Sequence, residues 1–206
     1  MTFTFKENPP KRVLIINIFG IGDVLFTTPV ISNLKASYPD LYIGYVCNSR
    51  TAAILQSNPK IDKVIIYDSD DFKEASQKSK MIVFRKLGGF LREIKKERFD
   101  TSIDVSLSDF TGWVTWMAGI KRRVGFKYKS RGFFLNQKLM LKGYEDKHVV
   151  EYYLNLLESV GIKNLHEFAR DLLKISMVNS RLLSSISPAL HEIWDKWKNA
   201  FHNVRI

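Results

Sequence analysis

The sequence has very little of what disulfide frameworks and metal centres require. Cys47 is the single cysteine among 206 residues and lies within an apolar run, which excludes an internal disulfide and a cysteine-based zinc site. The four histidines are scattered without metal-ligand spacing. No apolar run approaches the roughly 20 residues of a membrane-spanning helix. The N-terminus also lacks the charged-then-apolar layout of a signal peptide. These absences predict a cytoplasmic protein without a metal site.

Acidic residues are scarce relative to basic ones. The chain has 21 Asp and Glu against 32 Lys and Arg, a net charge of +11. Residues 110–144 contain eight basic residues and no acid, and residues 73–98 contain nine basic residues and three Glu. A single lysine usually serves only solvation, but this surplus predicts a polyanionic partner such as nucleic acid, an anionic membrane or a phosphorylated substrate. Nucleic acid is disfavoured because no helix-turn-helix, zinc-finger or RNP-type pattern is present.

Strand-like and helix-like segments alternate along the chain. Apolar runs predict strands at residues 13–19, 42–47, 63–67, 101–105 and 124–126. Helical spacing of apolar residues predicts helices at residues 24–37, 51–57, 110–118 and 149–160, with a basic helix around residues 87–94. This alternation predicts an α/β fold with an open, mostly parallel, Rossmann-like sheet and helices on both faces.

The pattern changes after residue 162. A serine-rich stretch at residues 180–187 is typical of a linker, and Pro188 begins an amphipathic segment. We therefore expect a Rossmann-like domain at residues 1–165, followed at residues 166–206 by a linker and an amphipathic helix.

The first predicted strand leads into a glycine turn and a helix start, Arg12 to Pro29 (RVLIINIFGIGDVLFTTP). Gly20 and Gly22 suggest dinucleotide binding, but the third small residue of that fingerprint is missing. Asp23 lies where a pyrophosphate would sit and would repel it. A nicotinamide-dependent oxidoreductase is therefore the least favoured function.

Asp23 has two interpretations on sequence alone. It is either the N-cap of the helix, a role that aspartate fills well, or a general base at the carboxyl end of the first strand. In the second case we expect the helix N-terminus to keep the carboxylate ionised and to lower its basicity.

A series of motifs resembles glycosyltransferase family 9, the heptosyltransferases of lipopolysaccharide core assembly. The resemblance begins at residues 12–29 and extends to about residue 162. It includes Tyr38-Pro39-Asp40, Asn58-Pro59, Ile61-Asp62-Lys63-Val64, Arg98-Phe99-Asp100 with Ile103-Asp104, the GIKRRVG segment from Gly119 to Gly125, and Asp146-Lys147-His148 to Leu157.

The resemblance implies the N-terminal, acceptor-binding domain of a GT-B enzyme. It implies inverting transfer without a metal, from a nucleotide-sugar donor of the ADP-heptose type, to an anionic lipid-linked saccharide such as lipopolysaccharide. Asp23 matches the proposed catalytic aspartate of the family. The glycine-rich donor domain has no counterpart before Ile206, so we expect a missing C-terminal donor domain and no turnover by these residues alone.

The same resemblance suggests where the acceptor binds. The expected acceptor-binding residues are Gly20, Gly22, Thr27, Arg85, Lys86, Arg122, Arg123 and His148. Arginine suits phosphates and acidic sugars because it pairs with them in a bidentate manner. An anionic membrane surface, on the inner face of the cytoplasmic membrane, is the expected second partner. The alternative function is a non-catalytic module that binds an anionic saccharide or membrane.

Overall fold

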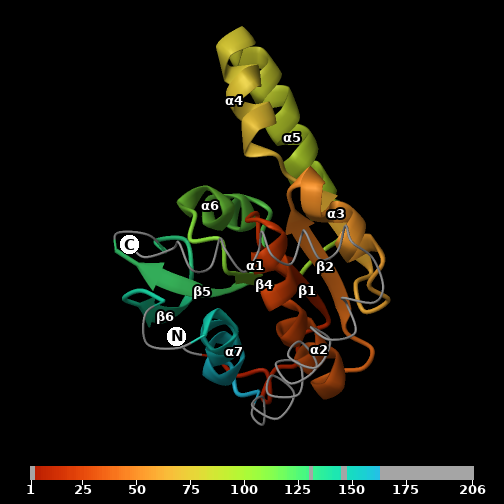
Figure 1. Cartoon of the computed structure of the whole chain (residues 1–206), viewed down its shortest axis with the longest axis vertical. Coiled ribbons are helices and arrows are strands. Elements are labelled where there is room, and N and C mark those ends of the chain that lie inside the picture. Colours follow the sequence, from red (N-terminus) through yellow and green to blue (C-terminus); the bar gives the residue numbers. More distant parts are fainter. Residues whose placement is uncertain (1–2, 130–131, 145–147, 163–206) are drawn as a thin grey trace, which may run out of the picture. The chain divides into compact units, whose positions relative to one another are not determined.

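The computed structural model describes residues 3–129, 132–144 and 148–162, which belong to a compact unit of residues 1–163 (Figure 1). The chain's second unit, residues 164–206, lies outside the described residues. The predicted linker and amphipathic helix fall in that second unit and stay predictions.

A single six-stranded sheet forms the centre of the described unit, in the order β3-β2-β1-β4-β5-β6, and each pair of neighbouring strands is parallel. The α/β, Rossmann-like prediction is therefore confirmed. The strands are β1 (Arg12–Ile16), β2 (Tyr42–Cys47), β3 (Lys63–Ile66), β4 (Thr101–Asp104), β5 (Arg122–Tyr128) and β6 (Gln137–Leu141).

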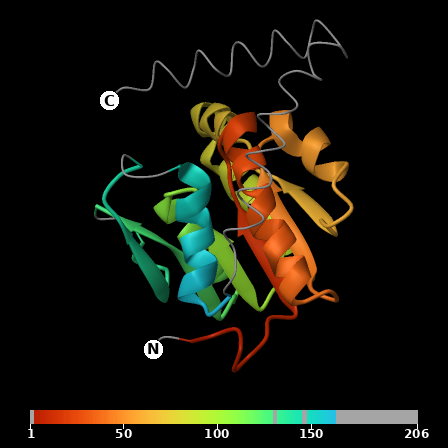
Figure 2. The same ribbon diagram turned by 60° about the horizontal axis from the view of Figure 1, so that its bottom comes forward.

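Helices cover both faces of this sheet (Figures 1 and 2). Helices α1 (Ile21–Phe26), α2 (Thr28–Ser37) and α7 (Val149–Ser159) lie together on one face. Helices α5 (Lys80–Lys96) and α6 (Asp109–Met117) contribute to the core on the other, while α3 (Ser49–Gln56) packs on β2 and β3. Helix α4 (Ser69–Lys78) pairs with α5, and this α4–α5 hairpin projects away from the sheet (Figure 1).

Continuous apolar strands place the core on both sheet faces. Val13 to Ile16 of β1 are all buried, as expected for a central parallel strand. Leu14 and Ile16 join Phe90 and Ile94 of α5 in one cluster. Burial of this apolar surface contributes about 25 cal/mol per Å² to folding. Packing on both faces of the sheet therefore holds β1, and the turn that follows it, in a fixed position.

The helix predicted at residues 24–37 is two helices, and the reason is local. Pro29 has no N–H to donate to the carbonyl of Leu25. The hydroxyl of Thr28 donates to that carbonyl instead, at 2.7 Å. The hydroxyl of Thr27 donates to the carbonyl of Val24 at 2.7 Å. Helix α1 therefore starts at Ile21 and ends at Phe26, and α2 begins after it.

The strand order reverses between β1 and β4. In doubly wound sheets ligands bind in the crevice at this point, outside the carboxyl ends of the strands. The turn after Ile16 and the loop after Asp104 flank this crevice, because the two residues are register partners. The fold therefore places Asp23 beside the position where chemistry is expected.

Candidate functional site

Asp23 lies in the first turn of α1, three residues after the N-cap residue Gly20. Its carboxylate accepts hydrogen bonds from the backbone N–H groups of Gly20 and of Asp23 itself. This resembles the reach-back half of a capping box, in which a side chain inside the helix satisfies the N–H of the cap residue. The N-cap interpretation of Asp23 is therefore wrong, because Gly20 occupies that position.

The pKa of Asp23 is raised from its ordinary value of 3.8, because partial burial disfavours the charged carboxylate more than the two backbone hydrogen bonds favour it. The N–H groups at the helix start lower the pKa as expected, but burial outweighs them, so the net shift is upward. Helix α1 has six residues, so its dipole is small, and desolvation of the carboxylate is the larger effect. The carboxylate is a stronger proton acceptor than an exposed aspartate.

Two buried asparagines hold the turn that presents Asp23. The side-chain amide of Asn17 donates to the carbonyl of Asp23 at 2.9 Å, and its oxygen accepts from the N–H of Phe19 at 3.1 Å. Asn48, which follows β2, donates to the carbonyls of Phe19 and Ile18 at 2.6 and 3.3 Å. The turn is thus tied to both β1 and β2, and the sequence alone did not identify either asparagine as a site residue.

Tyrosines lie beside the carboxylate of Asp23. Its charge raises the pKa values of Tyr144, Tyr153 and Tyr45, after burial as the larger cause. The pKa of Tyr144 is raised to about 12, so its phenol stays protonated. Tyr45 is fully buried and shares a hydrogen bond with the hydroxyl of Thr27. The tyrosines therefore supply neutral phenols and no competing base.

The predicted residues Gly20 and Gly22 belong to the turn and helix that carry Asp23, and His148 contacts the same helix through Phe26. Gly20 and Gly22 flank the carboxylate in the turn and helix α1. His148 caps α7 by accepting from the N–H of Val150 at 3.3 Å, and its ring meets Phe26 of α1 edge-on at 4.9 Å. Burial lowers the pKa of His148 from 6.5, consistent with the neutral ring that this acceptor role requires.

Thr27 does not fit its predicted role. The side chain is fully buried and its hydroxyl is occupied by Val24 and Tyr45. The hydroxyl of Thr27 is therefore not available at the surface of α1 and instead supports the backbone beneath it.

Arg122 and Arg123 lie at the opposite edge of the sheet from Asp23. Arg122 is the register partner of Thr101, and Thr101 is the register partner of Val13. Val13 lies three residues before the end of β1, so about 10 Å along the strand direction separates Arg122 from the end of β1 that leads to Asp23. Arg122 forms an ion pair with Asp100, and Arg123 donates to the carbonyls of Phe134 and Ile120. The prediction that these arginines bind the acceptor with Asp23 is therefore not supported.

Arg85 and Lys86 lie on α5 in the projecting hairpin. Lys86 is paired with Asp71 of α4 at 3.0 Å, and Arg85 is exposed without a partner among the described residues. The hairpin extends beyond the carboxyl ends of the strands, the edge that also carries α1 (Figure 1). Both residues therefore lie toward the same end of the strands as Asp23, although α5 and α1 cover opposite faces of the sheet.

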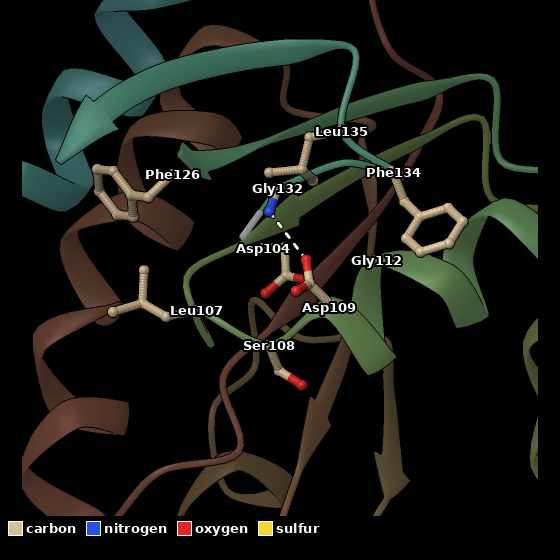
Figure 3. A pocket seen from close by; sticks show the side chains of 9 residues that line it. All are labelled: Asp104, Leu107, Ser108, Asp109, Gly112, Phe126, Gly132, Phe134 and Leu135. Carbon is tan, nitrogen blue, oxygen red and sulfur yellow. Dashed lines mark hydrogen bonds between the residues drawn. The ribbon is translucent and has the colours of Figure 1, made fainter. Parts of the chain in front are cut away.

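A second polar cluster lies across the crevice, at the end of β4 (Figure 3). Asp104 is buried and accepts from the N–H of Ser106 at 2.8 Å and from the hydroxyls of Ser106 and Thr111 at 2.6 Å. Burial raises its pKa, and the nearby charge of Asp109 adds to this. Asp109 in turn accepts from the N–H of Gly132 at 2.9 Å.

The cavity beside this cluster is small. Its volume is about 10 Å³, which is room for a single water molecule. Gly112, Gly132, Phe126, Phe134 and Leu135 are among its lining residues. The cavity does not accommodate a sugar, so the Asp104 cluster shapes the loop beside the crevice and is not a saccharide pocket.

In the described ranges, no helix has the length and apolar composition to cross a bilayer. The same ranges contain no group of three or more His, Cys, Asp or Glu arranged to hold a metal ion.

Comparison with known proteins identifies relatives of this site and fold. The family model for glycosyltransferase family 9 (heptosyltransferase) matches residues 87–177. Lipopolysaccharide heptosyltransferase 3 of Escherichia coli is 29% identical over 153 residues, which is 70% of this chain and 41% of the relative. A relative from Haemophilus influenzae is 29% identical over 150 residues, or 72% of this chain and 40% of the relative. The chain thus spans about 40% of the length of the curated relatives it matches.

Solved structures show the same fold. Escherichia coli heptosyltransferase WaaC with ADP-2-deoxy-2-fluoro heptose superposes with a TM-score of 0.63 at 21% identity, covering 74% of this chain and 49% of that chain. A family 9 glycosyl transferase from Veillonella parvula gives a TM-score of 0.61 at 23% identity, covering 75% of this chain and 43% of that chain. At these identities the superpositions establish the architecture alone.

Proposed function

From the premise that the chain belongs to glycosyltransferase family 9, we propose that it is the acceptor-binding half of an inverting glycosyltransferase with Asp23 as the general base. The observation that carries this proposal is the position of one carboxylate, with a raised pKa, at the carboxyl end of β1 beside the switch point. That crevice is where α/β sheets bind ligands.

The proposed reaction uses Asp23 to remove one proton. An acceptor hydroxyl oxygen bonds to the anomeric carbon of the donor sugar as the bond from that carbon to the nucleotide phosphate breaks on the opposite face. Configuration at the carbon inverts, the nucleotide leaves with the electron pair, and the hydroxyl proton passes to the carboxylate of Asp23. The hydroxyl becomes acidic only as the new bond forms, so a carboxylate suffices as base.

The surroundings of Asp23 support this role. Partial burial strengthens the carboxylate as a base, while the N–H groups of Gly20 and Asp23 keep it oriented. Asn17 and Asn48 fix the backbone that carries it. Tyr144 is close enough for the charge of Asp23 to raise its pKa, so its phenol stays protonated near the carboxylate. A carboxylate held rigidly in this way reduces the cost of reaching the reactive geometry.

The proposed co-substrate is a nucleotide sugar of the ADP-heptose type, bound by a C-terminal donor domain that faces the crevice. The proposed acceptor is an anionic, lipid-linked saccharide of the lipopolysaccharide kind. The net charge of +11 suits such an acceptor, as do Arg85 and Lys86 of α5, the helix of the hairpin that extends beyond the carboxyl ends of the strands. A lipid-linked acceptor places the protein at the periphery of the inner face of the cytoplasmic membrane.

The test joins the 206-residue chain to the C-terminal half of Escherichia coli lipopolysaccharide heptosyltransferase 3 and measures transfer from ADP-heptose to a lipopolysaccharide core acceptor. We expect Asp23→Ala to reduce kcat by about 10²- to 10⁴-fold, the usual contribution of a general base. The matched control is Asp40→Ala, because Asp40 is an exposed carboxylate in the turn before β2, at the opposite edge of the sheet.

The outcomes separate the two functions. Transfer that survives in Asp23→Ala at the wild-type rate contradicts the base assignment. Saturable binding of the core saccharide without transfer, equal in wild type and Asp23→Ala, supports the alternative of a non-catalytic binding module.

A further inference from the structure

The α4–α5 hairpin carries an apolar and basic surface that the proposed reaction does not use. The hairpin turns at Ser79, and its tip lies far from the sheet, beyond the carboxyl ends of the strands (Figure 1). Met81 and Phe84, near that tip, are 74% and 70% exposed. Large apolar side chains with this exposure at a projecting tip indicate a contact surface.

The two side chains belong to one stripe of α5. Helical spacing of three, four and seven residues places Met81, Phe84, Arg85, Gly88 and Arg92 on the same face, and all five are exposed. The buried residues Phe90 and Ile94 lie on the opposite face, against the core. One face of α5 therefore packs against the core, and the opposite face is exposed and available to a partner.

The charge around this stripe selects the partner. From Ala75 to Arg92 the hairpin has no acidic residue and five basic ones: Lys78, Lys80, Arg85, Lys86 and Arg92. Lys78 and Lys86 are partly neutralised by Glu74 and Asp71 of α4. Lys80, Arg85 and Arg92 keep their charge without an ion-pair partner among the described residues. An apolar strip flanked by cations is typical of a surface that inserts shallowly into an anionic lipid interface.

We propose that the exposed stripe of α5, from Met81 to Arg92, docks the protein on an anionic bilayer, with Met81 and Phe84 entering the interface and the arginines contacting lipid phosphates. This deepens the proposed function by naming the surface that meets the membrane. The hairpin projects from the same edge of the sheet as Asp23, so docking turns the crevice toward the membrane that holds a lipid-linked acceptor (Figure 1).

The test measures binding of the 206-residue chain to vesicles of phosphatidylcholine with about 30 mol% phosphatidylglycerol and compares it with binding to vesicles of pure phosphatidylcholine. We expect Met81→Ser with Phe84→Ser to weaken partition into the anionic vesicles by about 100-fold, because burial of each apolar side chain contributes roughly tenfold. Circular dichroism and the Tm are expected to stay at wild-type values, since both side chains are exposed.

The matched control is Phe133→Ser with Met140→Ser. It removes the same two residue types at similar exposure, 79% and 67%, from the β5–β6 connection and from β6. This control is expected to bind vesicles as the wild type does. A second readout attaches an environment-sensitive dye at Met81→Cys, since Cys47 is buried and should not react; its emission shifts to the blue with anionic vesicles.

Three results would overturn the proposal. The first is equal vesicle binding by wild type and the Met81, Phe84 double variant, and the second is equal weakening by the control pair. The third is a concentration-dependent dimer that the double variant abolishes without any effect of lipid, which would assign the stripe to a second copy of this chain. Vesicle binding needs neither donor nor turnover, so its failure leaves the transfer reaction standing, and loss of transfer leaves vesicle binding intact.

Discussion

Removal of the Asn17 side chain tests how the turn presents Asp23. Asn17 is fully buried, and its amide joins the carbonyl of Asp23 at 2.9 Å to the N–H of Phe19 at 3.1 Å. The change Asn17→Ala leaves both backbone groups without this partner and removes a buried side chain. Each unpaired group costs about 1–3 kcal/mol when water does not replace the lost partner. Because both groups are only part-buried, we expect a total loss of about 2–4 kcal/mol in the free energy of unfolding.

Urea denaturation followed by circular dichroism measures this loss, and thermal denaturation gives a decrease of about 5–12 °C in Tm for a chain of this size. The control is Asn33→Ala, in which the lost amide donates only to the carbonyl of Pro29 one turn earlier in α2, at 2.8 Å. We expect the control to lose no more than about 1 kcal/mol. A stability of Asn17→Ala within 0.5 kcal/mol (about the error of the method) of wild type would refute the idea that this amide holds the turn.

Three further changes test the packing and the electrostatics. Gly44→Ala places a Cβ 2.3 Å from the ring of buried Phe99, so we expect a loss of about 1–3 kcal/mol by urea denaturation; an unchanged midpoint would contradict this packing. A Cβ at Gly88 or Gly89 meets nothing within 4 Å, so alanine at each is expected to raise stability by about 1 kcal/mol, and a lower Tm would show a hidden contact. Burial raises the pKa of Asp104 above 3.8, so its ionisation costs folded-state stability as pH rises through the folded pKa. Relative to wild type, Asp104→Asn should therefore gain stability as the pH rises above 3.8, and a parallel pH dependence of the two proteins would contradict the shift.

The apolar strands were predictable because a strand that is buried on both faces of a parallel sheet requires a continuous run of apolar residues. The segment VLII of β1 is such a run, and its prediction missed only the strand ends. Strand β6 left no such record, since QKLML is buried only at its two ends, and it was missed. Helix α4 was missed for a similar reason, because Ala75 is its one buried residue.

The site was predictable only in part. Asp23 follows from the strand, glycine turn and helix start, which are contiguous in the chain. Asn48, just after β2, reaches the turn at Phe19 across 29 residues of chain, and Tyr45 of β2 reaches Thr27 across 18 residues, through strand pairing that no local pattern encodes. The family resemblance and their charge grouped Arg122 and Arg123 with Asp23, whereas the register of β5 places them at the other end of the strands.

The exposed stripe of α5 shows a different limit. The basic composition of residues 73–98 indicated an anionic partner, but it did not distinguish the side chains that pack from those that face outward. That distinction required the hairpin, in which Phe90 and Ile94 are buried while Met81 and Phe84 project.

The most direct test of the account is the transfer rate of Asp23→Asn in the chain joined to a donor domain. Asparagine has the same shape as aspartate and its oxygen accepts the N–H of Gly20, but it does not take up a proton. We expect Asp23→Asn to decrease kcat by about 10²- to 10⁴-fold and to leave the KM for the acceptor nearly unchanged. A wild-type kcat, or a loss confined to KM, would contradict the assignment of Asp23 as the base.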